Sequence, residues 1–326
     1  MKYNFVCLES HLIDHLAPIW NALPQENKTK FIVPKTLYNY ANDKLISNLI
    51  SIDNYESIPK LTKQDTNVVC SLHNYNQLKS TGKNVFYFEH GAGQIYNCDH
   101  ASYASGGGRK NVKKYFATNQ ICHDAFIKNH NAESYIVGCA KLDQYSNRNW
   151  TKNNKICISF HWDCKVVPET QTSFFYYKDY LKKLQNSLKE LGIELVGHGH
   201  PHSWDIFKYF YTSLEIPIMK NFDDIIEQCD MYIVDNSSTL FEFAATGKPV
   251  VVLNCPLYRK NIKHGMRFWE FADIGPQVDN ANDLNKIVID LYSNDTFKER
   301  RQEITNIIYP YMGESTNRII KYLIIG

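Results

Sequence analysis

The sequence has no apolar run long enough to cross a membrane, and its start, MKYNFVCLESH, lacks the apolar core of a secretory signal peptide. Its nine cysteines include no C-x-x-C pair, and Cys7, Cys70 and Cys157 lie inside apolar, strand-like runs. These absences argue against a membrane span, a disulfide scaffold and a cysteine metal site. We therefore expect a cytoplasmic protein with free, buried thiols, for which any membrane contact is peripheral.

An excess of charge of either sign is also missing. The chain has 36 Lys and Arg against 34 Asp and Glu, a formal net charge of +2. This balance gives no support to a protein that coats nucleic acid. At 326 residues, 44% hydrophobic and 13% aromatic, the chain is globular and too long for one ordinary core. We predict two domains, an acceptor-side domain over residues 1–150 and a nucleotide-donor domain over residues 151–326.

Short apolar runs alternate with amphipathic segments in both halves. The strand-like runs include YNFVCL, KFIVP, TNVVCSLH, NVFYF, KICISF, IELV, MYIV and PVVVLN. Alternation of strands and helices with short connections predicts parallel sheets covered on both faces. The predicted fold class is α/β and GT-B-like, with two doubly wound Rossmann-type domains facing a central cleft and a helical C-terminal tail.

Polar residues gather directly after four of these strands. The four turns are EHGAG after NVFYF, HWDC after ICISF, GHGHPH after IELV and DNSST after MYIV. In doubly wound sheets ligands bind beyond the carboxyl ends of the strands. The four turns are therefore the candidate site.

The turn DNSST leads from a predicted strand straight into a predicted helix. Hydroxyl groups and free backbone N–H groups at a helix start favour an anion such as a diphosphate. We predict that Ser237, Ser238 and Thr239 bind a donor diphosphate. Asp235 at the strand end and Glu242, about two turns into the helix, are predicted to bind the ribose or base. The alternative is a helix cap, for which Ser and Thr are generally favoured.

The turn GHGHPH, residues 197–202, contains three alternating histidines. A zinc site is one interpretation, but no acidic or Cys partner lies at ligand spacing. We predict instead that His200 contacts the donor diphosphate and that His198 lies near the ribose or base. No metal and no cofactor is expected.

The segment FEHGAGQIY, residues 88–96, ends a strand with Glu89 and His90 before two glycines, which permit a tight turn. A histidine here suits a general base because its pKa lies near working pH, and Glu89 is the predicted partner that orients it. The alternative is a structural histidine bonded to the turn backbone. The residues predicted for the acceptor side are Gly91, Gly93, Gln94 and, from the basic glycine-rich segment ASYASGGGRKNVKK, Arg109.

Taken in order, these pieces resemble the CDP-glycerol glycerophosphotransferase family, GT-B enzymes that build teichoic-acid chains. The resemblance spans roughly residues 85–280. Its pieces are His90-Gly91, GCAKLD at 138–143, ISFHWD, His200-Pro201, VDNSSTLFEF and Gly275-Pro276. The D-x-S-S-x-x-x-[DE]-F element within VDNSSTLFEF is the most specific of them.

The resemblance implies roles for the matching residues. His90 would deprotonate the acceptor hydroxyl, His200, Ser237 and Ser238 would hold the donor diphosphate, and Glu242 would bind the donor ribose or a nearby hydroxyl. This chain has Ala-Gly-Gln-Ile after the His-Gly turn, where the family has Thr-Pro-Leu-Lys. That departure leaves the acceptor open.

We therefore predict a metal-independent transferase with His90 as general base. It moves a glycerol-phosphate or glycosyl group from a nucleotide-diphosphate donor, similar to CDP-glycerol, to a polymer, a glycan or a modified-DNA acceptor. The first alternative is a GT-B glycosyltransferase that uses a nucleotide sugar. The others are a nucleotide-sugar epimerase, with Glu89 and Asp163 as candidate acids, and a non-catalytic nucleotide-binding module.

Overall fold

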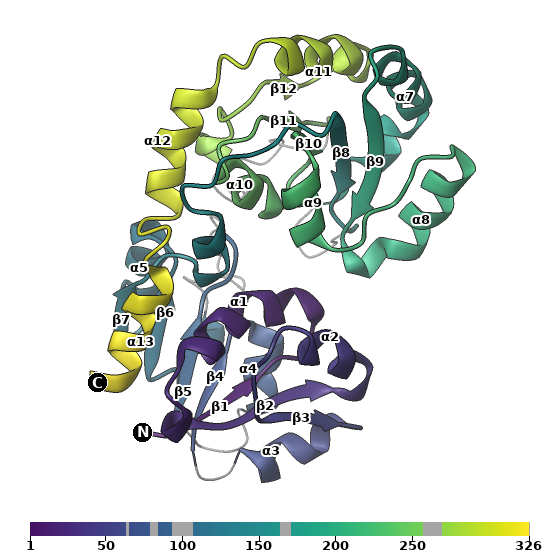
Figure 1. Ribbon diagram of the computed structural model, residues 1–326. Coiled ribbons are helices and arrows are strands. Elements are labelled where there is room, and N and C mark those ends of the chain that lie inside the picture. The colour runs from purple at the N-terminus through teal and green to yellow at the C-terminus, as the bar shows by residue number, and fades with distance from the viewer. Residues whose placement is uncertain (63–64, 79–83, 93–106, 164–170, 257–268, 326) are drawn as a thin grey trace. The chain divides into compact units, whose positions relative to one another are not determined.

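Figure 1 shows the computed structural model, which describes residues 1–62, 65–78, 84–92, 107–163, 171–256 and 269–325. The chain divides into two compact units, which are described one at a time. The first unit is Met1–Asn147 with Asn306–Gly326, and the second unit is Arg148–Thr305. The sequence assigned the whole tail to the second domain, whereas residues 306–326 return to the first unit.

The first unit is built on a seven-stranded parallel sheet in the order β3-β2-β1-β4-β5-β6-β7. Its strands are β1 Tyr3–Val6, β2 Lys28–Pro34, β3 Leu49–Ile52, β4 Thr66–Val69, β5 Val85–Phe88, β6 Lys114–Ala117 and β7 Glu133–Ile136. This is the strand order of a Rossmann sheet, and the order reverses between β1 and β4.

Helices cover this sheet and close its core. They are α1 Ser10–Ala22, α2 Tyr38–Asn42, α3 Ile58–Leu61, α4 Leu72–Leu78, α5 Gln120–Ile127 and α13 Ser315–Ile325. The apolar face of α1 and two side chains of α13, Ile319 and Leu323, share one core with β1 and β2. The Tyr3 hydroxyl donates to Leu323 O at 2.6 Å, which fastens α13 to β1. The last helix of the chain thus completes the core that the first strand begins (Figure 1).

The second unit has a five-stranded parallel sheet in the order β12-β11-β10-β8-β9. Its strands are β8 Lys155–Phe160, β9 Glu194–Gly199, β10 Met231–Val234, β11 Val250–Leu253 and β12 Gln277–Val278. Its helices are α6 Phe174–Tyr177, α7 Leu181–Glu190, α8 Trp204–Ser213, α9 Phe222–Gln228, α10 Thr239–Ala244 and α11 Leu284–Ser293, followed by α12 Lys298–Ile308 at the unit boundary. The strand order reverses between β8 and β10.

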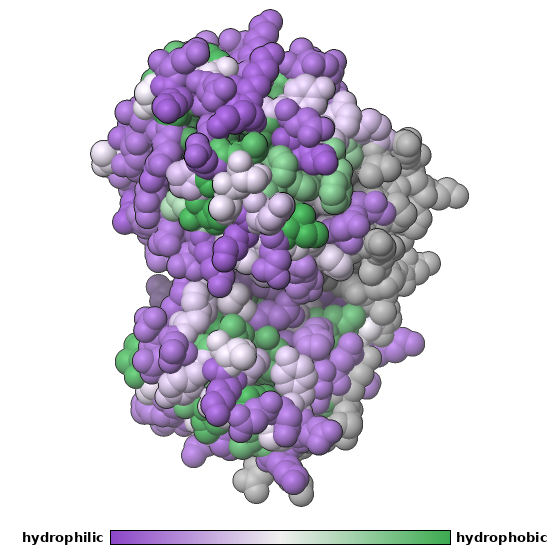
Figure 2. Space-filling model, turned by 90° about the vertical axis from the view of Figure 1, so that its right-hand side faces the viewer, coloured by the Kyte–Doolittle hydropathy of each residue, from purple (hydrophilic) through white to green (hydrophobic). Residues whose placement is uncertain are grey.

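The predicted α/β class and the helical tail are confirmed, since both sheets are parallel and α11, α12 and α13 end the chain. Among the described residues the cysteines are free and buried, as expected. The face shown in Figure 2 is mostly hydrophilic, with apolar side chains in small separate groups. None of the helices described is both long and apolar enough to span a membrane.

Candidate functional site

In the second unit, Asp235 directly follows β10 and is fully buried. Its carboxylate accepts the backbone N–H groups of His161 at 2.8 Å and Ser173 at 3.0 Å, and the Ser173 hydroxyl at 3.1 Å. These bonds tie the turn after β8 and the start of α6 to the end of β10. Asp235 therefore shapes the candidate donor site from within.

The hydroxyl residues Ser237, Ser238 and Thr239 follow Asp235 and are half-buried. Ser237 Oγ accepts the Thr239 hydroxyl at 2.9 Å and the Thr239 N–H at 3.4 Å, so this turn is held by its own side chains. Tyr232 Oη lies 3.0 Å from Thr239 Oγ1. Helix α10 has six residues, and Ser238 at its N-cap makes no side-chain capping bond to the described chain. Ser237 Oγ, one residue earlier, accepts the N–H of Thr239, the first residue of α10, which is the kind of bond that the helix-cap alternative predicts.

Glu242 lies in the first turn of α10 and is 2% exposed. The sequence placed it about two turns into the helix, because the helix was expected to start earlier. The ST-type turn made by Ser237 and Thr239 delays that start. This places Glu242 close in sequence and structure to the hydroxyl turn.

The three histidines of the turn after β9 have different surroundings. His198 is buried, and its Nδ1 lies 2.9 Å from Met219 O. His200 Nδ1 accepts the His202 N–H at 3.2 Å. The His200 ring lies 5.1 Å from that of His161 and 6.0 Å from that of Trp162, measured between centroids. Strands β8 and β9, which are paired in the sheet, thus bring His200 beside His161 and Trp162 of the turn that follows β8.

In the first unit, Glu89 continues the line of β5, since its N–H donates to Phe116 O at 2.9 Å. Its Oε2 accepts from Tyr115 Oη at 2.5 Å and from Arg109 Nη2 at 3.4 Å, and both the Glu89 and the Arg109 side chain are 0% exposed. Arg109 also donates to Tyr87 Oη at 2.9 Å. Burial, and then the Glu89 carboxylate, raise the pKa of Tyr115 well above its ordinary value, so this phenol stays a donor.

This enclosed network bears on two predicted roles. Glu89 was expected to orient His90, and Arg109 was expected to touch an acceptor. The structure gives both side chains partners inside the first unit, which argues for structural roles at these positions. The contacts of the Glu89 carboxylate are with Tyr115 and Arg109, which accounts for its complete burial.

His90 is half-buried, and two histidines of α1 lie beside it. The ring centroids of His11 and His15 are 6.0 and 5.9 Å from that of His90. His15 Nδ1 lies 3.7 Å from Cys139 Sγ. Burial, and then the charges of Lys141, His90 and His11, hold the pKa of His15 well below its ordinary value, so its ring is neutral. His11 and His15 are not among the residues predicted from the sequence. Their spacing of four residues on one helix, beginning at the end of β1, was the available signal.

The turn after His90 begins with Gly91 at φ 55°, a left-handed conformation that favours glycine, in agreement with a tight turn. Ala92 O accepts the Asn119 side-chain amide at 3.2 Å. Gly93 and Gln94, two of the predicted acceptor-side residues, lie outside the described residues.

The segment GCAKLD, residues 138–143, lies near the end of Met1–Asn147, the first of the two chain segments that form the first unit. Asp143 accepts the N–H groups of Gly313 at 2.9 Å, Ser315 at 3.1 Å and Thr316 at 2.6 Å, so it caps α13. Gly138 has φ 81°, and a Cβ there would lie 2.3 Å from Pro310 O. The segment GCAKLD thus holds the start of α13 against the first unit.

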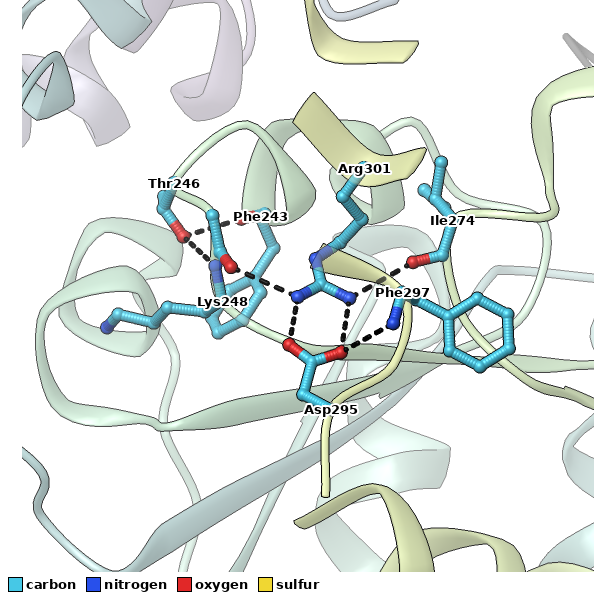
Figure 3. Close-up of polar contacts among 8 residues, drawn as sticks. Phe243, Thr246, Lys248, Ile274, Asp295, Phe297 and Arg301 are labelled. Atoms are coloured by element: carbon cyan, nitrogen blue, oxygen red, sulfur yellow. Dashed lines mark hydrogen bonds and ion pairs between the residues drawn. The ribbon is translucent and has the colours of Figure 1, made fainter. Parts of the chain in front are cut away.

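A further polar cluster, absent from the sequence analysis, fastens α12 to the second unit (Figure 3). The fully buried Arg301 guanidinium forms a two-pronged ion pair with Asp295 and donates to Ile274 O at 3.3 Å and Gly247 O at 3.1 Å. In the sequence, Arg301 is one of several charged residues of KERRQE and has no distinguishing feature. The cluster is structural.

Neither the family models nor the curated proteins include a match to this chain. Several solved structures are similar to it over nearly its full length. A UDP-GlcNAc 2-epimerase from Neisseria meningitidis, bound to UDP-GlcNAc, is 14% identical with a TM-score of 0.67 and 100% coverage of both chains. The wall teichoic acid polymerase TagF is 12% identical with a TM-score of 0.64, covering 99% of this chain and 88% of that one. Acinetobacter baumannii MurG is 13% identical with a TM-score of 0.52, covering 99% of each.

At these identities the likeness shows the fold, which is GT-B-like, with two parallel α/β units and a helical tail. Within the described part of the chain, no group of three or more His, Cys, Asp or Glu side chains is arranged to hold a metal ion.

Proposed function

We propose that this chain is a metal-independent transferase that takes a group from a nucleotide-diphosphate donor and passes it to an acceptor hydroxyl. The second unit binds the donor, and His90 of the first unit is the base. One observation carries the proposal: each sheet places its candidate side chains at the carboxyl ends of strands at or beside the point where its strand order reverses. Ligands of doubly wound folds bind at such points.

The donor half rests on residues that follow β8, β9 and β10. His161 and His200 adjoin one another, and Ser237, Ser238 and Thr239 stand half-exposed after β10. Imidazole, hydroxyl and backbone N–H donors stabilise a leaving phosphate without a metal. We propose that His200, Ser237 and Ser238 contact the diphosphate, with Glu242 at a neighbouring hydroxyl of the donor.

The transferred group is glycerol phosphate or a sugar. The motif D-x-S-S-x-x-x-E-F favours a CDP-alcohol donor, and the similarity to the teichoic acid polymerase TagF agrees with it. The similarity to an enzyme bound to UDP-GlcNAc favours a nucleotide sugar. Both reactions need the same two components, a base for the acceptor and a phosphate-binding turn for the leaving nucleotide.

A second candidate function is that of a UDP-sugar 2-epimerase. It is favoured by the match to an epimerase over the full length of both chains. Proton transfer at a sugar carbon needs acid and base groups at the ring. In the first unit the group beside His90 is a set of imidazoles, while Glu89 is enclosed with Arg109. This placement supports transfer as the leading proposal.

Calorimetry with CDP, UDP, GDP and ADP in the presence of EDTA tests the donor half. We expect a nucleoside diphosphate to bind, with cytidine preference leading to CDP-glycerol assays and uridine preference to UDP-sugar assays. The Ser237→Ala/Ser238→Ala double variant should bind that nucleotide more weakly by ~2–4 kcal/mol, the value of two charge-assisted hydrogen bonds. Ser187→Ala/Ser213→Ala, on α7 and at the end of α8, is the matched control. No binding to any nucleotide, or equal binding by both double variants, would overturn the donor site.

The two candidate reactions are separated by their products. Incubation of the protein with UDP-GlcNAc alone, followed by proton NMR, would show a 2-epimer only if the chain is an epimerase. A transferase instead releases nucleotide only when an acceptor hydroxyl is supplied, and His90→Ala should abolish this acceptor-dependent release. Epimer formation without an acceptor would replace the transferase proposal by the epimerase.

A further inference from the structure

Helix α1 brings two histidines to the candidate base. His11 and His15 are four residues apart, so they lie on one face of α1. Both rings lie close to the His90 ring, at centroid distances of 6.0 and 5.9 Å. Because α1 starts just after β1, the strand at which the sheet order reverses, these imidazoles stand where this fold binds ligands.

The two histidines of α1 differ in surroundings. His15 is 8% exposed, neutral and next to Cys139 Sγ. The His11 side chain is 37% exposed, and its Nε2 lies 3.8 Å from Glu9 Oε2. A carboxylate at that distance favours the protonated imidazole, whereas burial favours the neutral one. Of the two, His11 therefore has the surroundings that favour a protonated ring.

Three other ionisable groups of the first unit have surroundings that account for them without the histidines. Asp14 of α1 is paired with Lys44 and accepts from Tyr40. Glu89 is enclosed with Arg109, and the Cys70 thiol after β4 is held protonated, because burial, then Cys7, raise its pKa well above its ordinary value. Among the described residues, Glu9 lies beside His11, Cys139 lies beside His15, and the charge of Lys141 acts on His15.

We propose that His11 is a positioning residue for His90: the two rings lie side by side, and Glu9 favours a proton on His11. The positive charge on His11 then keeps His90 neutral, because a like charge disfavours a second one nearby. A general base must be unprotonated at the working pH, so the pairing keeps His90 ready to act. This inference rests on the proposed function.

The reaction balances with His90 as the only acceptor of the proton. The acceptor O–H bond breaks and its proton passes to His90. The freed oxygen forms the bond to the transferred group, and the bond from that group to the donor's phosphate oxygen breaks. The leaving nucleotide takes that electron pair. The proton that His90 has taken can then return to solvent through the partly exposed His11.

Histidine titration by NMR tests the pairing in the full-length, ligand-free protein labelled with ¹⁵N-histidine. In the wild type we expect His90 to titrate below the ordinary value of about 6.5 and His11 above His90. In His11→Gln the like charge is gone, so the pKa of His90 should rise by about one unit. In Glu9→Gln the carboxylate is gone, so the transition of His11 should move to lower pH.

His73→Gln is the matched control, because His73 is exposed on α4 of the same unit, beside Tyr55. It should leave the titration of His90 unchanged. If His90 titrates identically in the wild type, His11→Gln and Glu9→Gln, the pairing is wrong. Glu9→Gln leaves the imidazoles in place, so it tests the pairing even if His11→Gln does not fold.

Activity assays separate this inference from the proposed function. If transfer requires His90, the acid limb of the kcat/KM profile should shift upward in His11→Gln by the same amount as the pKa of His90, which a purely structural role would not produce. Coupled titration without transfer from any nucleotide donor would overturn the proposed function and leave the pairing of His11 with His90 supported. Transfer that depends on His90, without coupled titration, would overturn the pairing alone.

Discussion

Glu89 and Arg109 form an ion pair that the first unit encloses completely. Glu89→Gln keeps the shape of the side chain and an oxygen that accepts from Tyr115, but it leaves the positive charge of Arg109 without a carboxylate partner. We expect the free energy of unfolding, measured by chemical denaturation, to fall by about 3–5 kcal/mol. The Glu89→Gln/Arg109→Met double variant should recover a large part of that loss. The exposed Glu26→Gln is the control and should change stability by less than about 0.5 kcal/mol.

This result also decides the role of Glu89. If its carboxylate served mainly to orient His90, Glu89→Gln would lower activity while stability stayed near that of the wild type. Adjacency in sequence suggested such a partnership, whereas the structure shows the Glu89 carboxylate bonded to Tyr115 and Arg109. A sequence motif identifies the turn and does not by itself reveal which face each side chain occupies.

Lys248 gives the second unit a titratable group near neutral pH. Its Nζ donates to Ile226 O at 2.5 Å and Cys229 O at 2.8 Å, at the end of α9, and lies 3.8 Å from the centre of the Trp150 ring. Burial lowers the pKa of Lys248 from 10.5 to about 8. Between these two pH values the unfolded chain holds a proton that the folded chain has lost, so rising pH favours the folded state.

The comparison with Lys248→Met isolates this effect. The stability advantage of the wild type over the variant should grow by roughly 1–3 kcal/mol between pH 8 and 10.5, after allowance for solvent screening. Thermal unfolding of both proteins across that range measures it, and other groups that titrate there cancel in the difference. A constant difference would show that Lys248 has an ordinary pKa.

Among the elements, α13 depends on a cap that comes from far away in sequence. Asp143 satisfies three N–H groups at the start of α13, where a helix otherwise leaves its first amides without partners. Asp143→Ala should lower the free energy of unfolding by about 1–2 kcal/mol. Hydrogen exchange at Ser315 and Thr316 should become faster. Asp53→Ala, which removes an exposed pair with Lys35, is the control and should leave exchange in α13 unchanged.

The sequence predicts the short, fully buried strands β1, β4, β5 and β10, because each lies within a short run rich in apolar residues. It misses β3, an edge strand whose residues are mostly half-exposed and include the polar Ser51. It also misplaces the start of α10, since the bond between Ser237 Oγ and the Thr239 N–H sets that start. Hydrophobic pattern identifies elements, whereas side-chain bonds to the backbone set their ends.

For the molecule as a whole, the pattern of apolar residues does not say which core a helix joins. The sequence identifies α13 as helical, yet its apolar face would suit either sheet. The specific contacts are the Tyr3 hydroxyl on Leu323 O and the Asp143 cap, both made by residues of the first unit. The polar turns were found because strand ends are visible in sequence. His11 and His15 were missed because their importance depends on where α1 lies.

Because residues 306–326 belong to the first unit, the two units should differ in how they fold as separate fragments. A fragment of residues 148–305 contains the whole second core and keeps Arg301 with Asp295, so it should unfold in one cooperative transition. A fragment of residues 1–147 lacks Ile319 and Leu323 from its core and should show no such transition. Joining residues 306–326 to it through a flexible Gly/Ser linker should restore cooperative unfolding. The Ser146 hydroxyl donates to Met312 O at 3.3 Å, so the linker has only a short distance to span. Thermal unfolding followed by circular dichroism measures all three. Cooperative unfolding of residues 1–147 alone would mean that α13 is an accessory to the first unit and that its apolar core closes without the end of the chain.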